Sequence, residues 1–134
     1  MKRNLFVYIL FQMISLNGFS QFNLTIEITA IRNDNGKIML QLYDENQKVL
    51  TQETGIIKDS TSVFSVRDLN PGKYAVRYYH DENQNEKMDT NAFGKPTEGY
   101  GFSNSVTGKT APPPFERWLF EIRSDTMIIL KPVY

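Results

Sequence analysis

Cysteine is absent from this chain of 134 residues, and histidine occurs once, at His80. The absence of cysteine excludes disulfide bridges, thiolate metal sites, a cysteine nucleophile and a lipid-bearing N-terminal cysteine. A single histidine also excludes a catalytic zinc held by three histidines. Fifteen basic and fifteen acidic residues balance each other. The chain therefore lacks the basic excess that is typical of proteins that bind nucleic acid or anionic membranes.

The first twenty residues predict a secretory signal peptide. Lys2 and Arg3 precede an apolar run over residues 5–16, and small residues follow it up to Ser20. The run is roughly 12 residues long, whereas a membrane-spanning helix needs roughly 20. We therefore expect cleavage after Ser20 and a mature domain of residues 21–134 that is periplasmic or secreted and has no transmembrane segment. The alternatives are an uncleaved anchor and a buried N-terminal helix.

After this leader, apolar and polar residues alternate in several short segments, which is the pattern of strands with one buried face. The expected strands cover residues 22–30, 37–43, 62–69, 74–80, 115–123 and 126–133, with a short edge strand over 55–58 and inward-facing Trp118, Phe120 and Ile122. Asn35-Gly36 predicts a tight hairpin, residues 44–52 a polar loop, and Asn70-Pro71-Gly72-Lys73 a turn. Short strands separated by turns predict a single all-β domain, an antiparallel Greek-key β-sandwich of about seven strands.

Residues 81–114 form a polar segment, rich in glycine and proline, that has no strand pattern. Loops of this length are usually functional or disordered. In the acidic loop at its start (residues 81–89), oxygen-bearing side chains recur at Asp81, Asn83, Asn85 and Asp89. These residues fill positions 1, 3, 5 and 9 of a calcium loop of the EF-hand kind, and Lys87 offers its backbone carbonyl at position 7. The sequence therefore predicts a calcium site in the acidic loop.

Two positions depart from such a calcium loop. Glu86 stands at position 6, where the sharp turn favours glycine, and Ala92 stands at position 12, where a bidentate glutamate would close the shell. A ligand from elsewhere would have to complete the shell, and the candidates are Glu82, Asp44 and Glu98. We expect residues 94–104 to lie against the acidic loop. A metal-free turn rich in Asn and Asp, or a site for another ion, are the alternatives.

No enzyme motif stands out in the sequence. His80 lies at a strand end without an assigned nucleophile or orienting partner, and no glycine-rich phosphate loop opens a helix. We therefore expect a non-enzymatic module that binds an unidentified ligand, glycan or protein partner at the cell envelope. Tyr100 and Phe102 are candidates for a ligand surface. The alternative is a small extracytoplasmic hydrolase that uses His80 with Glu98 or Glu116.

Several motifs follow one another along the chain: Asn35-Gly36-Lys37, FSVRDLNPGKYAV (residues 64–76), HDENQNEKMDTN (residues 80–91), GKPTEGYGFSN (residues 94–104) and PPPFE (residues 112–116). Together they resemble the bacterial secreted family called domain of unknown function 2141, over about residues 22–132. The piece LNPGKY is also similar to transthyretin-like and carboxypeptidase-regulatory-like sandwiches. The resemblance implies a secreted or periplasmic β-sandwich and no established activity. The acidic loop of the family reads Asn-Gly-Asn-Gly, whereas this chain has Gln84 and Glu86 in place of the two glycines.

Overall fold

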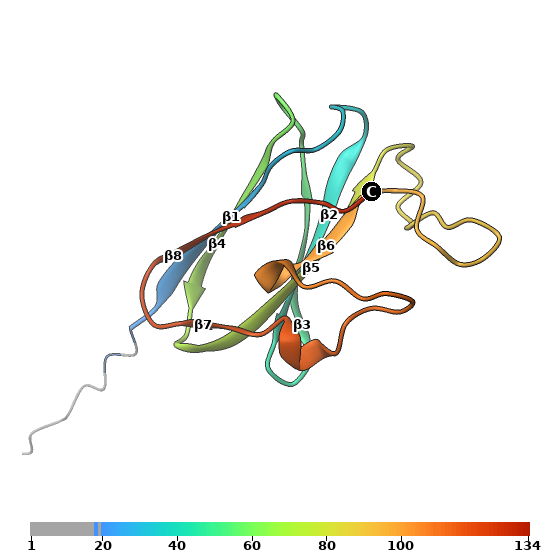
Figure 1. The fold of residues 1–134 in the computed structure, drawn as a ribbon. Helices are drawn as coiled ribbons and strands as arrows, with labels where there is room; N and C mark the ends of the chain where they lie inside the picture. The colour runs from blue at the N-terminus through green and yellow to red at the C-terminus, as the bar shows by residue number, and fades with distance from the viewer. Residues whose placement is uncertain (1–17, 19) are drawn as a thin grey trace, which may run out of the picture.

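Two β-sheets packed face to face make up the part of the chain that the computed structural model describes, residues 18 and 20–134 (Figure 1). The strands are β1 (Phe22–Ile28), β2 (Lys37–Asp44), β3 (Val49–Gly55), β4 (Ser62–Leu69), β5 (Gly72–Asp81), β6 (Tyr100–Phe102), β7 (Phe120–Ile122) and β8 (Thr126–Leu130), with the short 3-10 turns η1 (Ser103–Ser105) and η2 (Phe115–Arg117). Within this part, no helix has the length and apolar character to cross a membrane. The predicted signal peptide falls almost wholly on residues outside the described part.

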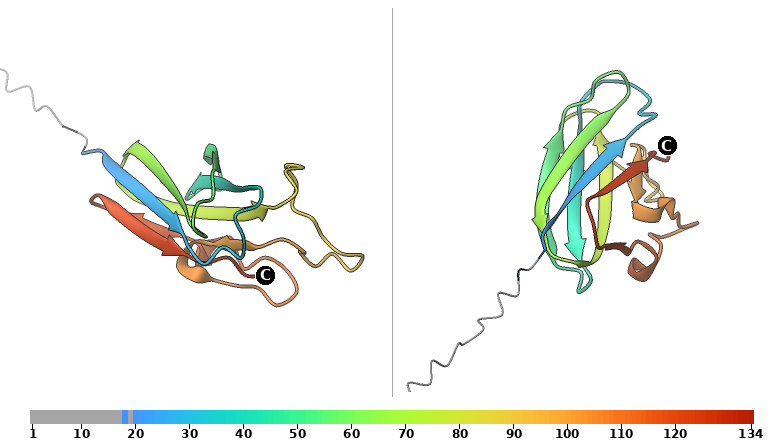
Figure 2. Two further views of the ribbon diagram at one scale, coloured as in Figure 1. Left: turned by 90° about the horizontal axis from the view of Figure 1, so that it is seen from above. Right: turned by 90° about the vertical axis from the view of Figure 1, so that its left-hand side faces the viewer.

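The strand order confirms the predicted all-β sandwich. The smaller sheet has the order β4-β1-β8, and the larger has the order β3-β2-β5-β6, with β7 also paired to β5. Figure 2 shows the two layers from other sides. β1 and β8 run parallel to each other, so the antiparallel arrangement predicted from the sequence is wrong for this pair. The two strands lie far apart in the sequence, and the chain reaches β8 by crossing from the larger sheet to the smaller one after β7.

The turn at Asn35-Gly36 does not form the predicted hairpin, because β1 and β2 lie in different sheets. Residues 29–36 instead cross between the layers beside the end of β5, where Lys37 pairs with Asp81. Gly36 has a left-handed φ of 70°, and a Cβ atom at this position would lie 1.9 Å from the carbonyl oxygen of Asp81. The close approach of two backbones therefore requires glycine here.

The strand β3 begins earlier than the sequence predicts. Residues 44–48 form a tight turn, in which the Asp44 carboxylate accepts the N–H groups of Asn46 and Lys48 at 2.9 Å each. β3 follows directly, so the predicted polar loop was too long and the predicted edge strand at 55–58 was placed too late. β3 lies at the edge of its sheet, and most of its side chains are at least partly exposed. Because neither face of β3 is buried, its sequence lacks the alternation of apolar and polar residues that predicts a strand.

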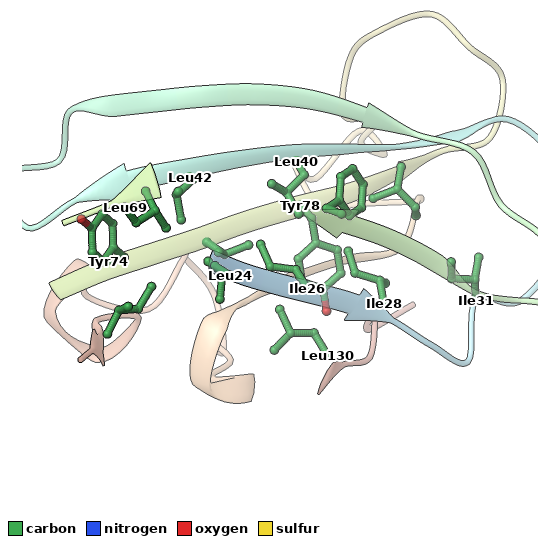
Figure 3. Packing of buried hydrophobic residues seen from close by; sticks show 14 residues of the cluster. Leu24, Ile26, Ile28, Ile31, Leu40, Leu42, Leu69, Tyr74, Tyr78 and Leu130 are labelled. Atoms are coloured by element: carbon green, nitrogen blue, oxygen red, sulfur yellow. The ribbon is translucent and has the colours of Figure 1, made fainter. Parts of the chain in front are cut away.

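The main hydrophobic core lies between the two sheets (Figure 3). β1 contributes Leu24, Ile26 and Ile28, whose side chains are fully buried, as the alternation predicts. Ile122 and Phe120 of β7 also pack in this core, in agreement with their predicted inward orientation. The facing layer comes from β2 and β5 and consists of Ile38, Leu40, Leu42, Tyr74, Val76 and Tyr78. Full burial of one such apolar side chain contributes about 1.5–3 kcal/mol, so this layer holds the sheets together.

A second, smaller core lies on the outer face of the larger sheet, opposite the main core. The outer-face segment (residues 103–119) crosses this face, and Trp118 packs there against Phe102 with ring centroids 4.3 Å apart. The ring of Phe115 lies 5.3 Å from that of Trp118. The predicted strand over residues 115–123 is therefore wrong in its first half, because η2 turns Trp118 onto the outer face rather than between the sheets.

Ser103 closes a gap in the hydrogen bonding along β5. β6 pairs with residues 77–79 of β5 and β7 pairs with residues 72–74, so neither strand reaches the stretch between them. In this gap the buried hydroxyl of Ser103 accepts the N–H of Val76 at 2.9 Å and donates to the carbonyl of Trp118 at 2.5 Å. One side chain thus joins the larger sheet to the outer-face segment.

Replacing Ser103 with alanine removes the partner of the buried Val76 N–H. An unsatisfied buried donor costs about 1–3 kcal/mol, so we expect Ser103→Ala to lower the free energy of unfolding by about this amount. Ser62→Ala is a matched control, because the hydroxyl of Ser62 is also buried but has no hydrogen-bond partner among the described residues. It should leave the stability unchanged or raise it. Urea denaturation followed by circular dichroism measures both, and equal losses in the two variants would contradict this role of Ser103.

Candidate functional site

The acidic loop leaves the end of β5 and is built around a buried carboxylate. Asp81, the last residue of β5, is fully buried. Its two carboxylate oxygens accept the backbone N–H groups of Asn85 at 3.1 Å and of Glu86 at 2.9 Å. The loop therefore turns back onto its own first residue, and Asp81 is the anchor of that turn.

Glu98 fastens the acidic loop from the following segment. Its buried carboxylate accepts the N–H groups of Glu82 at 3.0 Å and of Asp89 at 3.1 Å. The N–H of Thr97 also donates to the carbonyl of Asp89 at 2.9 Å. These contacts confirm that residues 94–104 lie against the acidic loop.

Three of the predicted calcium ligands meet at the tip of the loop. The side-chain amides of Asn83 and Asn85 both donate to the carboxylate of Asp89, at 2.8 Å from Asn85. The side-chain oxygen of Asn83 accepts the N–H of Asn85 at 3.1 Å, and that of Asn85 accepts the N–H of Lys87 at 3.0 Å. Lys87 therefore contributes its N–H to the loop, whereas the sequence assigns it a carbonyl role.

The predicted ligands all lie in one loop, where their side-chain oxygens are engaged in hydrogen bonds. Among residues 18 and 20–134, no group of three or more acidic, histidine or cysteine side chains is arranged to hold a metal ion. The oxygens of Asp81 and Glu98 instead accept backbone N–H groups. Asp44, a candidate to complete the shell, lies in the turn between β2 and β3. As arranged here, hydrogen bonds hold the acidic loop together.

Gln84 and Glu86 take a backbone conformation that glycine prefers. Their φ angles are 60° and 63°, in the left-handed region. This region costs a residue with a side chain roughly 1–2 kcal/mol. The loop thus keeps the tight turn implied by the Asn-Gly-Asn-Gly pattern, although the two glycines are missing.

An ion pair ties the acidic loop to the crossing between β1 and β2. Glu82 pairs with Arg32 and also accepts the side-chain amide of Asn33 at 2.9 Å. Burial alone would raise the pKa of Glu82, but hydrogen bonds from Arg32 and Asn33 and the charge of Arg32 together lower this pKa below its ordinary value. Glu82 is therefore ionised at neutral pH and already paired.

His80 is packed in the interior and does not face a cleft. Its side chain is fully buried, with Nε2 2.7 Å from the carbonyl oxygen of Asn35 and Nδ1 3.0 Å from the hydroxyl of Tyr134. A carbonyl only accepts, so Nε2 carries a proton, and in the neutral ring Nδ1 accepts from the tyrosine hydroxyl. Both ring nitrogens are occupied, which leaves neither of them for a substrate.

Of the two carboxylates predicted for a hydrolase, Glu116 lies far from His80 and Glu98 is already engaged by backbone N–H groups. Glu116 is exposed on η2, next to Phe115, whose ring centroid lies 6.0 Å from that of Tyr43. Tyr43 pairs with Ala75 of β5, and His80 lies five residues further along the same strand. A strand rises about 3.3 Å per residue, so Ala75, beside the Glu116 region, and His80 lie roughly 16 Å apart along β5. The other predicted carboxylate, Glu98, is used by the acidic loop.

A groove of about 780 Å³ opens on the outer face of the larger sheet, beside the second core. Its floor includes Tyr79 of β5 and Tyr100 of β6. Residues between 86 and 96 form one wall, and residues 108–113 of the outer-face segment form the other. Both of these loops extend beyond the sheet on the same side (Figure 1). Of the two aromatic candidates for a ligand surface, Tyr100 lines this outer-face groove, whereas Phe102 touches it and is mostly buried in the second core.

The outer-face groove was missed in the sequence because its lining comes from four separate segments. A signal was nevertheless present on the outward positions of β2 and β5. Gln41 and Arg77 are polar, but Met39, Tyr43, Ala75 and Tyr79 occupy other outward positions, where a solvent-facing strand would carry polar side chains. Apolar residues on both faces of a strand indicate a sheet that is covered on both sides.

The comparisons with known proteins give one result. The profile of the family described as uncharacterized protein conserved in bacteria (DUF2141) matches residues 26–129. A comparison with curated proteins gives no match. The matched range includes the acidic loop and both walls of the outer-face groove, so these features lie in the part of the chain that the family profile covers.

Replacing Gln84 with glycine should stabilise the domain. Relief of the left-handed φ outweighs the extra freedom that glycine gives the unfolded chain, and we expect a net gain of about 0.5–1 kcal/mol. Gln84 is exposed, so the change removes no packed contact. Lys87→Gly is a matched control in the same loop, because the φ of Lys87 is not left-handed, and it should lower the stability. Urea denaturation measures both variants, and a loss for Gln84→Gly as large as that for Lys87→Gly would contradict the prediction.

Proposed function

We propose a function from the premise that this chain belongs to the bacterial family DUF2141, whose profile matches residues 26–129. The protein is an exported, non-enzymatic domain that binds a ligand in the outer-face groove. The observation that carries the proposal is the groove itself, a concave site of about 780 Å³ between two long loops. Export is supported by the leader pattern of the first twenty residues.

Size and rigidity favour the groove as a ligand site. Small-molecule sites usually measure roughly 300–1,000 Å³ and are largely preformed, with a mostly apolar lining and a few polar groups. One wall is fastened by Asp81 and Glu98, which hold backbone N–H groups of the acidic loop. The other wall is fastened by Trp118 and Ser103. Loops that are held on a rigid scaffold in this way commonly carry function.

The surroundings of His80 support a non-enzymatic role over a hydrolase. A general base must reach the proton that it removes, directly or through one water. The ring of His80 is fully buried, and both nitrogens have hydrogen-bond partners. Glu98 is committed to the acidic loop and Glu116 lies at the other end of the larger sheet. These contacts favour a structural role for His80 over the predicted pairing of His80 with Glu98 or Glu116 as a catalytic base.

Phe93→Ala tests the groove without disturbing the core. Phe93 lines the groove at its rim and is 95% exposed, so its truncation should leave the fold intact. Ile56→Ala is a matched control, because Ile56 is 83% exposed and does not line the groove. The probe is N-phenyl-1-naphthylamine, a neutral fluorophore whose emission rises in apolar sites. We expect saturable binding to the wild type and Ile56→Ala, and roughly fivefold weaker binding to Phe93→Ala through loss of an aromatic contact.

Two results of this titration would contradict the proposed function. One is the absence of saturable binding to the wild-type protein. The other is equal affinity of the Phe93→Ala and Ile56→Ala variants, which would place the probe elsewhere on the surface.

We further propose that calcium binds the acidic loop and supports this wall of the groove. The oxygen-bearing side chains of Asp81, Asn83, Asn85 and Asp89 lie in one tight turn, which favours a hard cation. Binding requires the amides of Asn83 and Asn85 to rotate, so that their oxygens replace the N–H groups that now face Asp89. With only two carboxylates among these four side chains, Asp81 and Asp89, the affinity should be in the submillimolar to millimolar class.

Calcium at several times such a dissociation constant should raise the melting temperature, because a ligand of the folded state alone stabilises that state. A chelator should reverse the rise. Asp89→Asn, which keeps the side-chain shape and removes one charge, should abolish the response. Asp44→Asn is the matched control in the turn between β2 and β3, and it should retain the response. A wild-type melting temperature that does not change with calcium would contradict calcium binding and leave the groove proposal intact.

A further inference from the structure

We infer that the outer-face groove selects an anionic ligand, a small molecule that carries a carboxylate, sulfonate or phosphate group beside an apolar ring or chain. The inference rests on the proposed function, because it names the ligand class of the same groove. Three features of the groove support it: the charge of its lining, the placement of Arg77 on its floor, and the apolar side chains around that arginine.

Basic side chains outnumber acidic ones in the groove. The lining contains the four basic residues Arg77, Lys87, Lys95 and Lys109. Glu86 is the acidic residue of the lining, and its carboxylate already pairs with Lys37 at 3.0 Å, outside the lining. None of the four basic residues forms a salt bridge within the described part of the chain. An anion that enters the groove therefore meets positive charge that the protein itself has not neutralised.

Arg77 is held in place on the floor of the groove by neutral partners. Its Nη2 donates to the side-chain oxygen of Gln41 on β2 at 3.0 Å. That oxygen also accepts the hydroxyl of Tyr43 at 2.6 Å, and the amide of Gln41 donates to Gln52 on β3 at 3.2 Å. The guanidinium is thus oriented without losing its charge, and its other N–H groups stay available for the paired oxygens of a carboxylate, sulfonate or phosphate.

Tyr79 can add a hydrogen bond to the same anion. It lies two residues after Arg77 on β5, so both side chains project from the outer face, and both line the groove. Burial raises the pKa of the Tyr79 phenol, and the charges of Asp81 and Glu98 raise it further. The phenol therefore keeps its proton at neutral pH and serves as a donor.

Apolar side chains surround this polar floor. Met39, Met88, Phe93, Pro96 and Tyr100 all line the groove. They offer contact surface to a ring or an aliphatic chain and no hydrogen bonds apart from the tyrosine hydroxyl. A small inorganic anion would leave this surface unused, whereas an amphipathic anion would cover it and reach Arg77 at the same time. A volume of about 780 Å³ suits a molecule of that size.

Two probes that differ by one charged group test the inference. They are 8-anilinonaphthalene-1-sulfonate and the neutral N-phenyl-1-naphthylamine, which share one ring system. We expect the wild-type protein to bind the sulfonate about tenfold more tightly than the neutral probe, and the difference to shrink as salt rises. Arg77→Gln should remove most of that difference, with the affinity for the neutral probe within about twofold of wild type. Lys95→Gln should act in the same direction through a second, exposed side chain.

Lys58→Gln is the matched control, because Lys58 is exposed and does not line the groove, and it should change neither affinity. Circular dichroism checks that each variant is folded. Equal affinities of the wild type for both probes, or a sulfonate preference that survives both Arg77→Gln and Lys95→Gln, would overturn anion selection and leave the proposed function standing. Failure of both probes to bind would overturn the proposed function as well.

Discussion

The packing of Trp118 on Phe102 is the contact on which the half of the molecule that carries the groove depends. The smaller sheet covers one face of the larger sheet, and the other face is covered by a segment without regular strands. Trp118 fixes the end of that segment, and its indole N–H donates to the carbonyl of Pro113 at 3.0 Å. Ser103 fixes the beginning through Val76. Residues 108–113, between these two fixed points, form a wall of the groove rather than a lining of the core.

Two buried carboxylates give the opposite wall its shape. Asp81 and Glu98 together accept four backbone N–H groups, all from the acidic loop. This arrangement fits a chain that has no cysteine, because side-chain hydrogen bonds here hold long loops that disulfides hold in many other proteins. The groove then lies between two segments that are fixed for different physical reasons, one by aromatic packing and one by charge-assisted hydrogen bonds.

Alternation of apolar and polar residues correctly predicted the strands that bury one face in the main core. Leu24, Ile26 and Ile28 alternate with polar residues, and they form the predicted buried row of β1. The spacing of oxygen side chains after Asp81 likewise located the acidic loop. The sequence-based prediction was wrong where a distant contact decides the local structure. Asn35-Gly36 predicted a hairpin, but Gly36 instead allows the backbone to approach Asp81 closely. Trp118 was predicted in a strand, but η2 turns its side chain onto the outer face. The groove could not be predicted for the same reason, because its walls come from separate segments that lie side by side only in the folded chain.

A ligand bound on the outer face of the larger sheet would change the surroundings of backbone amides there. An NMR titration of the isotope-labelled protein with 8-anilinonaphthalene-1-sulfonate tests such binding most directly, because each backbone amide reports its own surroundings. Binding in the groove should produce saturable shifts at Arg77, Tyr79 and Lys109, which line it. The exposed apolar residues Val63, Met127 and Ile129 of the smaller sheet should not respond. Shifts confined to those residues of the smaller sheet, with none in the groove, would show that the groove is not the binding site.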